Sequence, residues 1–369
     1  MTGSQAKSEV ESGAIRTDVK PERSILIDIL RGLSISLVVL GHTDEGMIHR
    51  HWWHAIIGYR IKFFIYSFHM PAFFFVSGIF LCASVQKRGS WRFTVEKLRT
   101  MVYPYVVLAC LFGVGFFVAS HFFGMGSMSV RTYVEDVATG KFSWFLPTIF
   151  FTVVAGMWLR RIPMPLLFVL SAAVSIYWPI TGLVFVDRGL KHLPFLVAGM
   201  WVGRSFERME KVPWVLAALG VVALFVSILW ITESRYLYSP YLFIPLGLMG
   251  TLMLLLLAHC LGRTVAARWL AWAGAGSIGI FLLSPYFQLA TRTVLLDVFH
   301  TSARYRQLLI PSIVAVVVPA WIYQHRVRLH LDWMFVWPFR SRRAAGVEGP
   351  SSEGFGVGVV GASGHEEKP

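Results

Sequence analysis

Long apolar segments constrain this chain more than any other feature of its sequence. About ten stretches are apolar and most are long enough to cross a bilayer as helices; they lie near residues 25–43, 61–83, 101–121, 142–159, 164–178, 190–203, 213–231, 239–259, 271–296 and 307–323. In lipid only helices and closed barrels satisfy the backbone, and segments of this length favour helices. The sequence therefore predicts an all-α integral membrane protein, a polytopic bundle of about ten transmembrane helices.

The charge distribution agrees with a membrane protein. Of the 369 residues, 56% are hydrophobic and only 15% are charged, whereas soluble domains carry about 25% charged residues. The net charge of +14 comes from basic residues in short loops between apolar segments. We assign these residues to membrane topology and to anionic headgroups or phosphates, and we expect a lipid bilayer but no nucleic acid as partner.

Metal-ligand patterns are incomplete in this sequence. The three cysteines lie in or beside apolar segments without metal-ligand spacing: Cys82, Cys110 and Cys260. Histidines surround two tryptophans in a short loop, namely His49, His51 and His54. No acidic or cysteine partner completes a ligand set there, and an interfacial aromatic belt explains the loop. We expect no metal and no covalently bound cofactor.

The placement of Lys and Arg predicts the topology. A basic loop at 84–100 and the arginines after the last apolar segment place both termini in the cytoplasm, and an even number of spans agrees with this. Residues 1–23 contain no cleavable signal and read as a disordered cytoplasmic tail. We expect a membrane domain at 24–330, a largely disordered cytoplasmic tail at 331–369, and a multi-pass location in the inner (plasma) membrane.

The first apolar segment contains ionisable residues at a spacing that a helix makes meaningful. Arg31 and His42 are three helical turns apart, so they share one face and are separated by about 16 Å along the axis. Asp28 lies three residues before Arg31 and can pair with it. Such residues within a span indicate a functional site facing the bundle interior. The alternative is that Asp28 and Arg31 snorkel to the interface while His42 ends the helix.

The second apolar segment contains FHMPAFFFVSG at 68–78. Pro71 removes a backbone donor within the segment and clashes with the preceding turn, so we expect the helix to kink there. His69 either lines a cavity beside His42 or satisfies a backbone carbonyl that the kink frees. Gly78 permits close approach of a neighbouring helix.

Three further positions join His69 as candidates for binding a substrate or a soluble anionic donor. Lys97 and Arg99 belong to the basic segment 84–100, where apolar residues alternate with cations as in a segment lying at the membrane interface. Trp144 opens the segment 142–159 and either stacks on a sugar or belongs to an aromatic belt. Polar residues also crowd the loop that leads into the segment 190–203; they are Asp187, Arg188, Lys191 and His192.

These stretches resemble the acyltransferase-three family of integral membrane acyltransferases, and most closely its fucose 4-O-acetylase-like branch. The matching stretches occur in the family's order: IDILRGLSISLVVLGHT at 27–43, FHMPAFFFVSG at 68–78, FTVEKLRTMVYPY at 93–105, SWFLPTIFF at 143–151 and LPFLVAGMWVG at 193–203. The resemblance covers most of the first 203 residues. Beyond them the similarity is mainly in apolar character.

The resemblance implies transfer of an acyl group, usually acetyl, from cytosolic acyl-CoA to a sugar hydroxyl of a glycan or lipid-linked precursor. It implies that Arg31 and His42 match the family's functional Arg and His, and that Lys97 and Arg99 fall in its basic stretch. A neutral imidazole at His42 can act as general base toward the hydroxyl or can itself carry the acyl group. Arg31 stays protonated and can hold donor phosphates or a carbonyl, or orient Asp28.

Two other functions fit a bundle of this composition. A transporter or flippase for a polar or lipid-linked substrate also has charges within its spans, but it consumes no acyl-CoA. A sensor or assembly partner without chemistry would fill the Arg31 and His42 face with structural contacts. The acceptor sugar and the oligomeric state do not follow from the sequence.

Overall fold

Helices make up all the regular structure in the part of the chain that the computed structural model describes, which is residues 25–49, 55–123, 129–206, 211–233, 240–301 and 303–338. The α-helices are α1 (Ile25–His49), α2 (Ala55–Tyr66), α3 (His69–Arg88), α4 (Ser90–Lys97), α5 (Tyr103–Phe123), α6 (Val130–Thr139), α7 (Phe145–Leu159), α8 (Met164–Tyr177), α9 (Val184–Val202), α11 (Trp214–Glu233), α12 (Pro240–Leu261), α13 (Val265–Ala275), α14 (Ser277–Thr293), α15 (Arg304–Gln324) and α16 (Asp332–Phe335). Two π-helical turns, η1 (Leu98–Val102) and η3 (Val294–Val298), and a 3₁₀ turn, η2 (Gly203–Ser205), extend α4, α14 and α9. The predicted tail at 1–23 and the tail beyond 338 lie outside the described residues.

Seven helical stretches among these residues are long and apolar enough to cross a membrane. They are Ile25–Ile48, Gly58–Arg88, Ser90–Val118, Trp214–Thr232, Pro240–Leu261, Ser277–Val298 and Arg304–Gln324. Three more of the predicted spans are helical but fall short of this standard: α7 and α8 have 15 and 14 residues, and α9 carries three charged residues near its start. A straight span needs about 20 apolar residues, so these three remain predictions.

Where a kink was expected at Pro71, the structure has a break between two helices just before it. α2 ends at Tyr66 and α3 begins at His69, with Pro71 in the first turn of α3, where its missing N–H costs no helical hydrogen bond. The Ser67 hydroxyl donates to the carbonyls of Phe63 and Phe64 at 3.0 and 2.7 Å. The segment therefore crosses the bundle as two helices with a polar joint between them.

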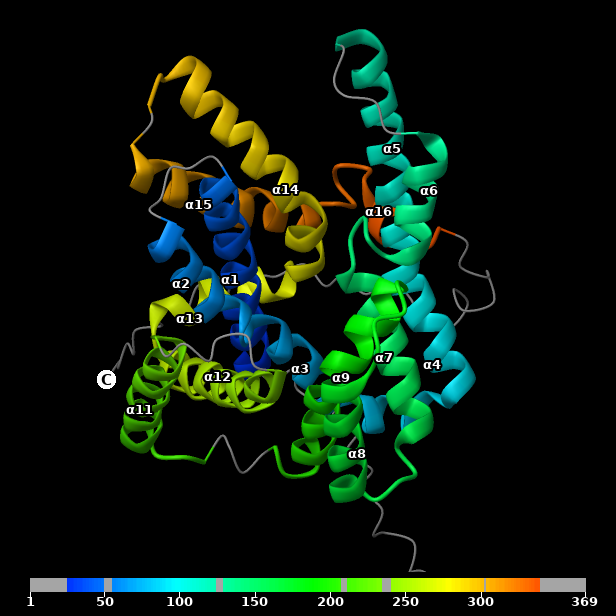
Figure 1. Cartoon of the computed structure of the whole chain (residues 1–369), viewed down its shortest axis with the longest axis vertical. Coiled ribbons are helices and arrows are strands. Elements are labelled where there is room, and N and C mark those ends of the chain that lie inside the picture. The colour runs from blue at the N-terminus through cyan, green and yellow to red at the C-terminus, as the bar shows by residue number, and fades with distance from the viewer. Residues whose placement is uncertain are drawn as a thin grey trace, which may run out of the picture. The chain divides into compact units, whose positions relative to one another are not determined.

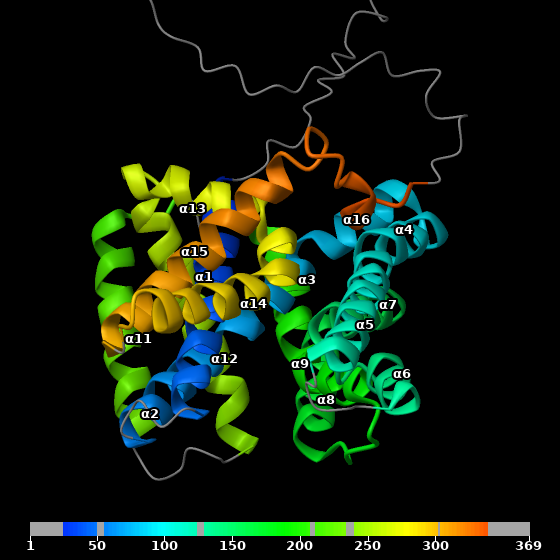
Figure 2. The same cartoon turned by 90° about the horizontal axis from the view of Figure 1, so that it is seen from above.

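α3 lies at the centre of the fold, between two groups of helices (Figures 1 and 2). On one side it contacts α1 and α12, and on the other it contacts α7 and α9. Its fully buried residues belong to two apolar clusters, one containing Phe74 with Phe195 of α9, the other containing Ala72 with Leu254 of α12. α3 therefore joins the part of the molecule that carries α1 to the part that carries α9.

Glycines let α3 and α9 pack with their backbones in contact, as expected for Gly78. A methyl group at Gly78 would overlap the carbonyl oxygen of Leu196, and one at Gly199 would overlap the carbonyl oxygen of Phe75. Gly32 of α1 meets the backbone of Leu270 of α13 in the same way. Small residues at such crossings allow the close backbone approach on which helix association in lipid depends.

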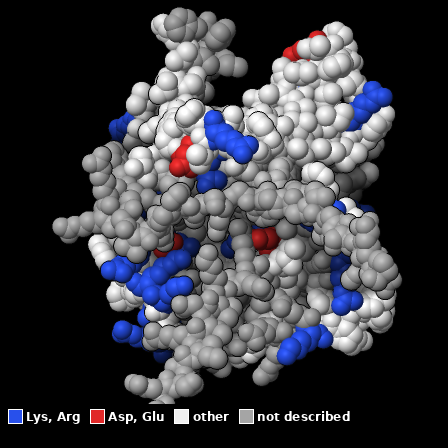
Figure 3. Space-filling model, turned by 180° about the vertical axis from the view of Figure 1, so that it is seen from behind, with Lys and Arg blue, Asp and Glu red and all other residues white. Residues whose placement is uncertain are grey.

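The surface of the bundle is largely uncharged. Lys and Arg form separate patches with uncharged surface between them on the face seen from behind (Figure 3). Large apolar side chains are exposed on several helices, among them Trp158, Leu219 and Val222, each exposed by more than 60%. Exposed apolar area on this scale is expected where helices face lipid.

The helical unit continues beyond α15. The chain up to Val336 forms one compact unit. Within it, the hydroxyl of Tyr103 at the start of α5 donates to the carbonyl of Trp333 in α16 at 2.6 Å. Of the second unit, which starts at Trp337, only residues 337 and 338 are described.

Candidate functional site

His42 lies near the end of α1, against the last turn of α2. Its side chain is 45% exposed, and its Nδ1 lies 3.3 Å from the hydroxyl oxygen of Tyr66 and 3.6 Å from Oε2 of Glu45. The Tyr66 hydroxyl also lies 3.0 Å from that same Oε2 atom, to which it donates a hydrogen bond. The Nδ1 edge of the imidazole ring is thus in contact with a tyrosine and a carboxylate, while the side chain as a whole is partly exposed.

The hydrogen-bond directions fix the tautomer of His42. Tyr66 has a single hydroxyl hydrogen, and the carboxylate of Glu45 can only accept, so this hydrogen goes to Glu45. The Tyr66 oxygen must then accept from His42, which places the imidazole hydrogen on Nδ1. Nε2 keeps its lone pair and is the atom that can take a proton. The carboxylate of Glu45, 3.6 Å from Nδ1, also stabilises by its charge the imidazolium formed when Nε2 is protonated.

Lys62 of α2 anchors the carboxylate. Its Nζ donates to Oε1 of Glu45 at 2.5 Å and lies 5.5 Å from the centre of the Tyr66 ring. Glu45 therefore accepts from Lys62 through one oxygen and from Tyr66 through the other. Both of its oxygens are fixed, so its orientation toward His42 is fixed too.

The opposite side of α1 is fixed by α14 and α15. Gln288 donates to the carbonyl of Val39 at 2.8 Å, and Arg292 donates to the carbonyl of Thr43 at 3.1 Å. The hydroxyl of Ser312 donates to Oγ1 of Thr43 at 3.0 Å. These contacts hold the turn of α1 from which His42 projects. The position of the imidazole therefore depends on the packing of α1 against α14 and α15.

His69 lies behind Tyr66 and is buried. Its ring packs edge-on against the Tyr66 ring at 4.9 Å, and its Nδ1 donates to the carbonyl of Ile65 at 2.6 Å. This bond satisfies a carbonyl at the end of α2, one of the two roles expected for His69. Its ring is also close enough to His42 to interact with it electrostatically.

A second group of side chains faces this site from α7 and α9. The guanidinium of Arg188 lies 4.5 Å from the centre of the Trp144 ring, and Trp144 stacks on His192 at 5.7 Å. Arg188 also interacts electrostatically with Tyr66. The Trp144 ring thus holds the Arg188 guanidinium on the side of the site where Tyr66 and His42 lie. We name Arg188, Lys191, His192, Trp144 and Phe243 the α9 cluster.

The remaining candidates gather at the other end of α1, which we name the basic end. Arg31 lies 3.7 Å from Asp28 and 5.8 Å from the centre of the Phe80 ring of α3. Lys97 interacts electrostatically with Arg31 and Arg88. Arg99 is exposed on the π-helical turn η1 that follows Lys97.

The structure therefore divides the predicted site residues into two groups. His42, His69 and Trp144 lie at one end, and Asp28, Arg31 and Lys97 lie at the other. α1 is continuous between Arg31 and His42, and both side chains face the segment formed by α2 and α3, as their spacing predicts. Their offset along α1 is about 16 Å.

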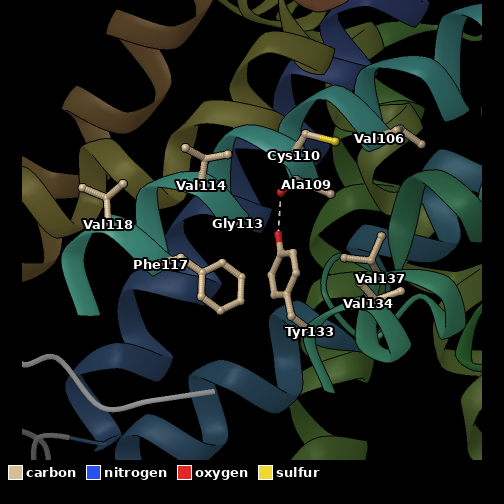
Figure 4. A pocket seen from close by; sticks show the side chains of 10 residues that line it. All are labelled: Val106, Ala109, Cys110, Gly113, Val114, Phe117, Val118, Tyr133, Val134 and Val137. Carbon is tan, nitrogen blue, oxygen red and sulfur yellow. Dashed lines mark hydrogen bonds between the residues drawn. The ribbon is translucent and has the colours of Figure 1, made fainter. Parts of the chain in front are cut away.

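A pocket of about 460 Å³ lies elsewhere, between α5 and α6 (Figure 4). Its walls are almost entirely apolar, and the one hydroxyl on them, that of Tyr133, donates to the carbonyl of Ala109 at 2.5 Å. No residue of α1, α2 or α9 lines it. We therefore assign no chemistry to this pocket.

Comparison with family models decides the class of the protein. Residues 25–324 match the model of the acyltransferase-three family, which is described as an acyltransferase domain. The chain belongs to the acyltransferase-three family. The match covers the helices from α1 to α15 and hence both ends of the candidate site. Comparisons with curated proteins and with solved structures gave no significant match. The apolar helices and the family together make the chain a multi-pass membrane acyltransferase.

Several residues of this acyltransferase site were missed by reasoning from sequence. Glu45 could have been found, since it lies one helical turn after His42 on the same face. Lys62 and Tyr66 follow in α2, and nothing in the sequence shows that α2 folds back along α1. From the sequence, Arg188 and Lys191 were assigned only to the loop that leads into a span at 190–203. That placement was wrong, because α9 begins at Val184 and holds both residues on helical turns.

Asp187 lies in the first turn of α9 and binds the turn that precedes this helix. Its carboxylate accepts hydrogen bonds from the backbone N–H and hydroxyl of Thr181, from the N–H of Gly182 and from the indole of Trp178. Burial acts to raise the pKa of Asp187, but these hydrogen bonds outweigh it and lower the pKa. Asp187 is therefore a charged group whose carboxylate stabilises the turn at the start of α9.

Proposed function

We propose that this chain is an O-acetyltransferase that moves an acetyl group from cytosolic acetyl-CoA to a sugar hydroxyl of a glycan or lipid-linked precursor. This is the activity implied by its resemblance to the fucose 4-O-acetylase-like branch, and it places the enzyme in the inner membrane as a modifier of polysaccharides. The observation that carries the proposal is the hydrogen-bonded chain from Glu45 through Tyr66 to His42.

His42 acts as the general base in this proposal. Nε2 takes the proton of the sugar hydroxyl while the hydroxyl oxygen bonds to the thioester carbon. The bond from that carbon to the CoA sulfur then breaks, and the imidazolium returns its proton to the sulfur. Glu45 offsets the positive charge on the ring between these two proton transfers. Acid–base help of this kind contributes about 10²- to 10⁴-fold to a rate.

The basic end holds the donor. Arg31 and Lys97, with Arg99 beyond them, can pair with the phosphates of CoA. The thioester must then reach His42, about 16 Å away along α1. An extended pantetheine arm has this length scale, so the donor enters from the end of α1 opposite to the one where the acceptor hydroxyl is activated.

The test is transfer of isotope-labelled acetyl from acetyl-CoA into the membrane and glycan fractions, with wild type and His42→Ala compared at matched expression. Label that depends on His42 supports the proposal, and the labelled product identifies the acceptor. His325→Ala is the matched control, because His325 is also a histidine near a helix end but lies at the end of α15, where its Nδ1 donates to the carbonyl of Trp321. Equal label in wild type and His42→Ala would remove His42 from the chemistry. No label in either, with acceptor present, would favour a transporter.

A further inference from the structure

Two cations on α9 lack a carboxylate partner. Arg188 and Lys191 are one turn apart, and both are exposed. Like charges at this spacing repel each other on a helix. Among the residues that the structure describes, no carboxylate lies within 4.0 Å of either side chain. Asp187 is adjacent in sequence, but its carboxylate is occupied by the turn before α9.

Aromatic rings hold both cations in place. Arg188 lies 4.5 Å from the centre of the Trp144 ring, and Lys191 lies 4.6 Å from the centre of the Phe243 ring. His192 is buried between these rings, stacked on Trp144 and edge-on to Phe243. A ring face orients a cation without neutralising it, so both side chains keep the capacity to bind an anion.

The location of the pair indicates which substrate it meets. His192, one turn after Arg188, stacks on Phe74 of α3 at 4.7 Å. His69 in the first turn of α3 packs at 4.9 Å against Tyr66, whose hydroxyl contacts His42 and Glu45. Arg188 also interacts electrostatically with Tyr66. Arg31 and Lys97 lie at the opposite end of α1. An anion on the α9 cluster would therefore lie on the side of the base and away from the basic end.

We propose that Arg188 and Lys191 bind an anionic group of the acyl acceptor, so that the acceptor is an acidic sugar rather than a neutral one. The group is a carboxylate, as in a uronic acid, or a phosphate on the sugar. Arg188 offers a planar fork that matches either group, and Lys191 adds a second positive charge. The inference rests on the proposed function in calling the bound sugar the acyl acceptor. The preference for an anionic sugar can itself be measured by binding, without turnover.

The experiment is equilibrium binding of labelled sugars to the full-length protein purified in detergent. Three probes are compared: methyl glucuronide, glucose 1-phosphate and methyl glucoside. We expect wild type to bind at least one anionic probe more tightly than the neutral one by about tenfold or more, as for charge-assisted hydrogen bonds. The double variant R188Q/K191Q should lose this preference. The charge-conserving variants R188K and K191R should retain much of it.

The control is Lys141→Gln, because Lys141 precedes α7 and already has a carboxylate partner in Asp136 at 3.9 Å. Equal binding of all three probes, or a preference that survives in R188Q/K191Q, would overturn the proposal. So would saturable binding of coenzyme A that depends on Arg188, because the pair would then belong to the donor. A preserved preference without acetyl transfer from acetyl-CoA would contradict the proposed function alone. The anionic probe that binds more tightly distinguishes a carboxylate acceptor from a phosphate acceptor.

Discussion

The proposed base, His42, depends on a carboxylate that lies three residues further along the same helix. Glu45 receives hydrogen bonds from Lys62 and Tyr66 and faces Nδ1 of His42 at 3.6 Å. It does not touch the reacting atoms in this geometry, so it is a positioning residue. Its function is to keep the hydrogen of His42 on Nδ1 and to stabilise the charged ring.

Replacing Glu45 by Gln is therefore expected to lower the rate of acetyl transfer by about 10²-fold, within the range of acid–base catalysis. The Gln amide removes the charge that stabilises the imidazolium but keeps the shape of the side chain. The measurement is kcat and KM for labelled acetyl-CoA in membranes with equal protein content. The loss should appear in kcat, because the donor site at Arg31 is untouched.

Glu135→Gln is the control for this prediction, since Glu135 pairs with Arg131 on the exposed face of α6 at 2.8 Å. It should leave kcat unchanged. Glu45→Asp should recover part of the lost rate, because it restores the charge at a shorter reach. A Glu45→Gln enzyme as fast as wild type would show that the carboxylate has no part in the reaction.

Tyr66 and Glu45 should act as one unit. Tyr66→Phe removes a hydrogen bond whose net worth is about 1 kcal/mol, so we expect up to about a tenfold lower rate. In the double variant with Glu45→Gln, the two losses should not add, because Glu45 acts on His42 through the Tyr66 hydroxyl. A double-mutant cycle on kcat measures this coupling. Fully additive losses would mean that the two side chains act on the reaction separately.

At the scale of residues, sequence reasoning found what lies on one helix and missed what another helix supplies. The spacing of Arg31 and His42 was sufficient because α1 is a single unbroken helix. Tyr66 is 24 residues from His42, and Arg188 is far beyond both. Their approach depends on how α2 folds back along α1 and how α9 packs on α3, and no local pattern encodes either packing.

At the scale of elements, proline and glycine gave the most reliable signals. Pro71 marks the break between α2 and α3, and Gly78 marks the contact between α3 and α9. Hydropathy was weaker as a guide, because charged residues in the first turns of α9 concealed where that helix begins. Two of those charges contact aromatic rings, Arg188 that of Trp144 just before α7 and Lys191 that of Phe243 in α12.

Gly78, at the contact between α3 and α9, and Gly115, in open space on α5, should respond to replacement by alanine with stability changes of opposite sign. Gly78→Ala should destabilise the protein by about 1–3 kcal/mol, because the new methyl group overlaps the carbonyl of Leu196. Gly115→Ala on α5 should stabilise it by up to about 1 kcal/mol, because nothing lies within 4 Å and alanine favours a helix. Unfolding temperatures of the purified variants in one detergent measure both effects. Equal shifts for the two variants would show that backbone contact does not limit this helix pair.

At the scale of the whole molecule, the site has two chemically different ends joined by α1. The basic end carries Arg31, Arg88 and Lys97, and the other end carries His42 with the α9 cluster. The positive-inside rule predicts that the basic end faces the cytoplasm, the side from which the proposed acyl-CoA donor would come. The base would then lie toward the outer side, and α7, α8 and α9 would each cross the membrane despite the short length of the first two.

Cysteine labelling tests this arrangement in a variant whose native cysteines, Cys82, Cys110 and Cys260, are replaced by serine. Two exposed positions report on opposite ends: Ile180, which is 91% exposed before α9, and Trp91, which is 79% exposed after α3. A membrane-impermeant maleimide added to intact cells should label Ile180→Cys and spare Trp91→Cys, because only the first faces outward. Inside-out vesicles should give the reverse pattern, which also serves as the control for reactivity. Labelling of both positions from one side would place His42 and Arg31 on the same side of the membrane. A donor reaching along α1 from the cytoplasm to an outer acceptor would then be impossible, and both substrates would have to enter from that one side.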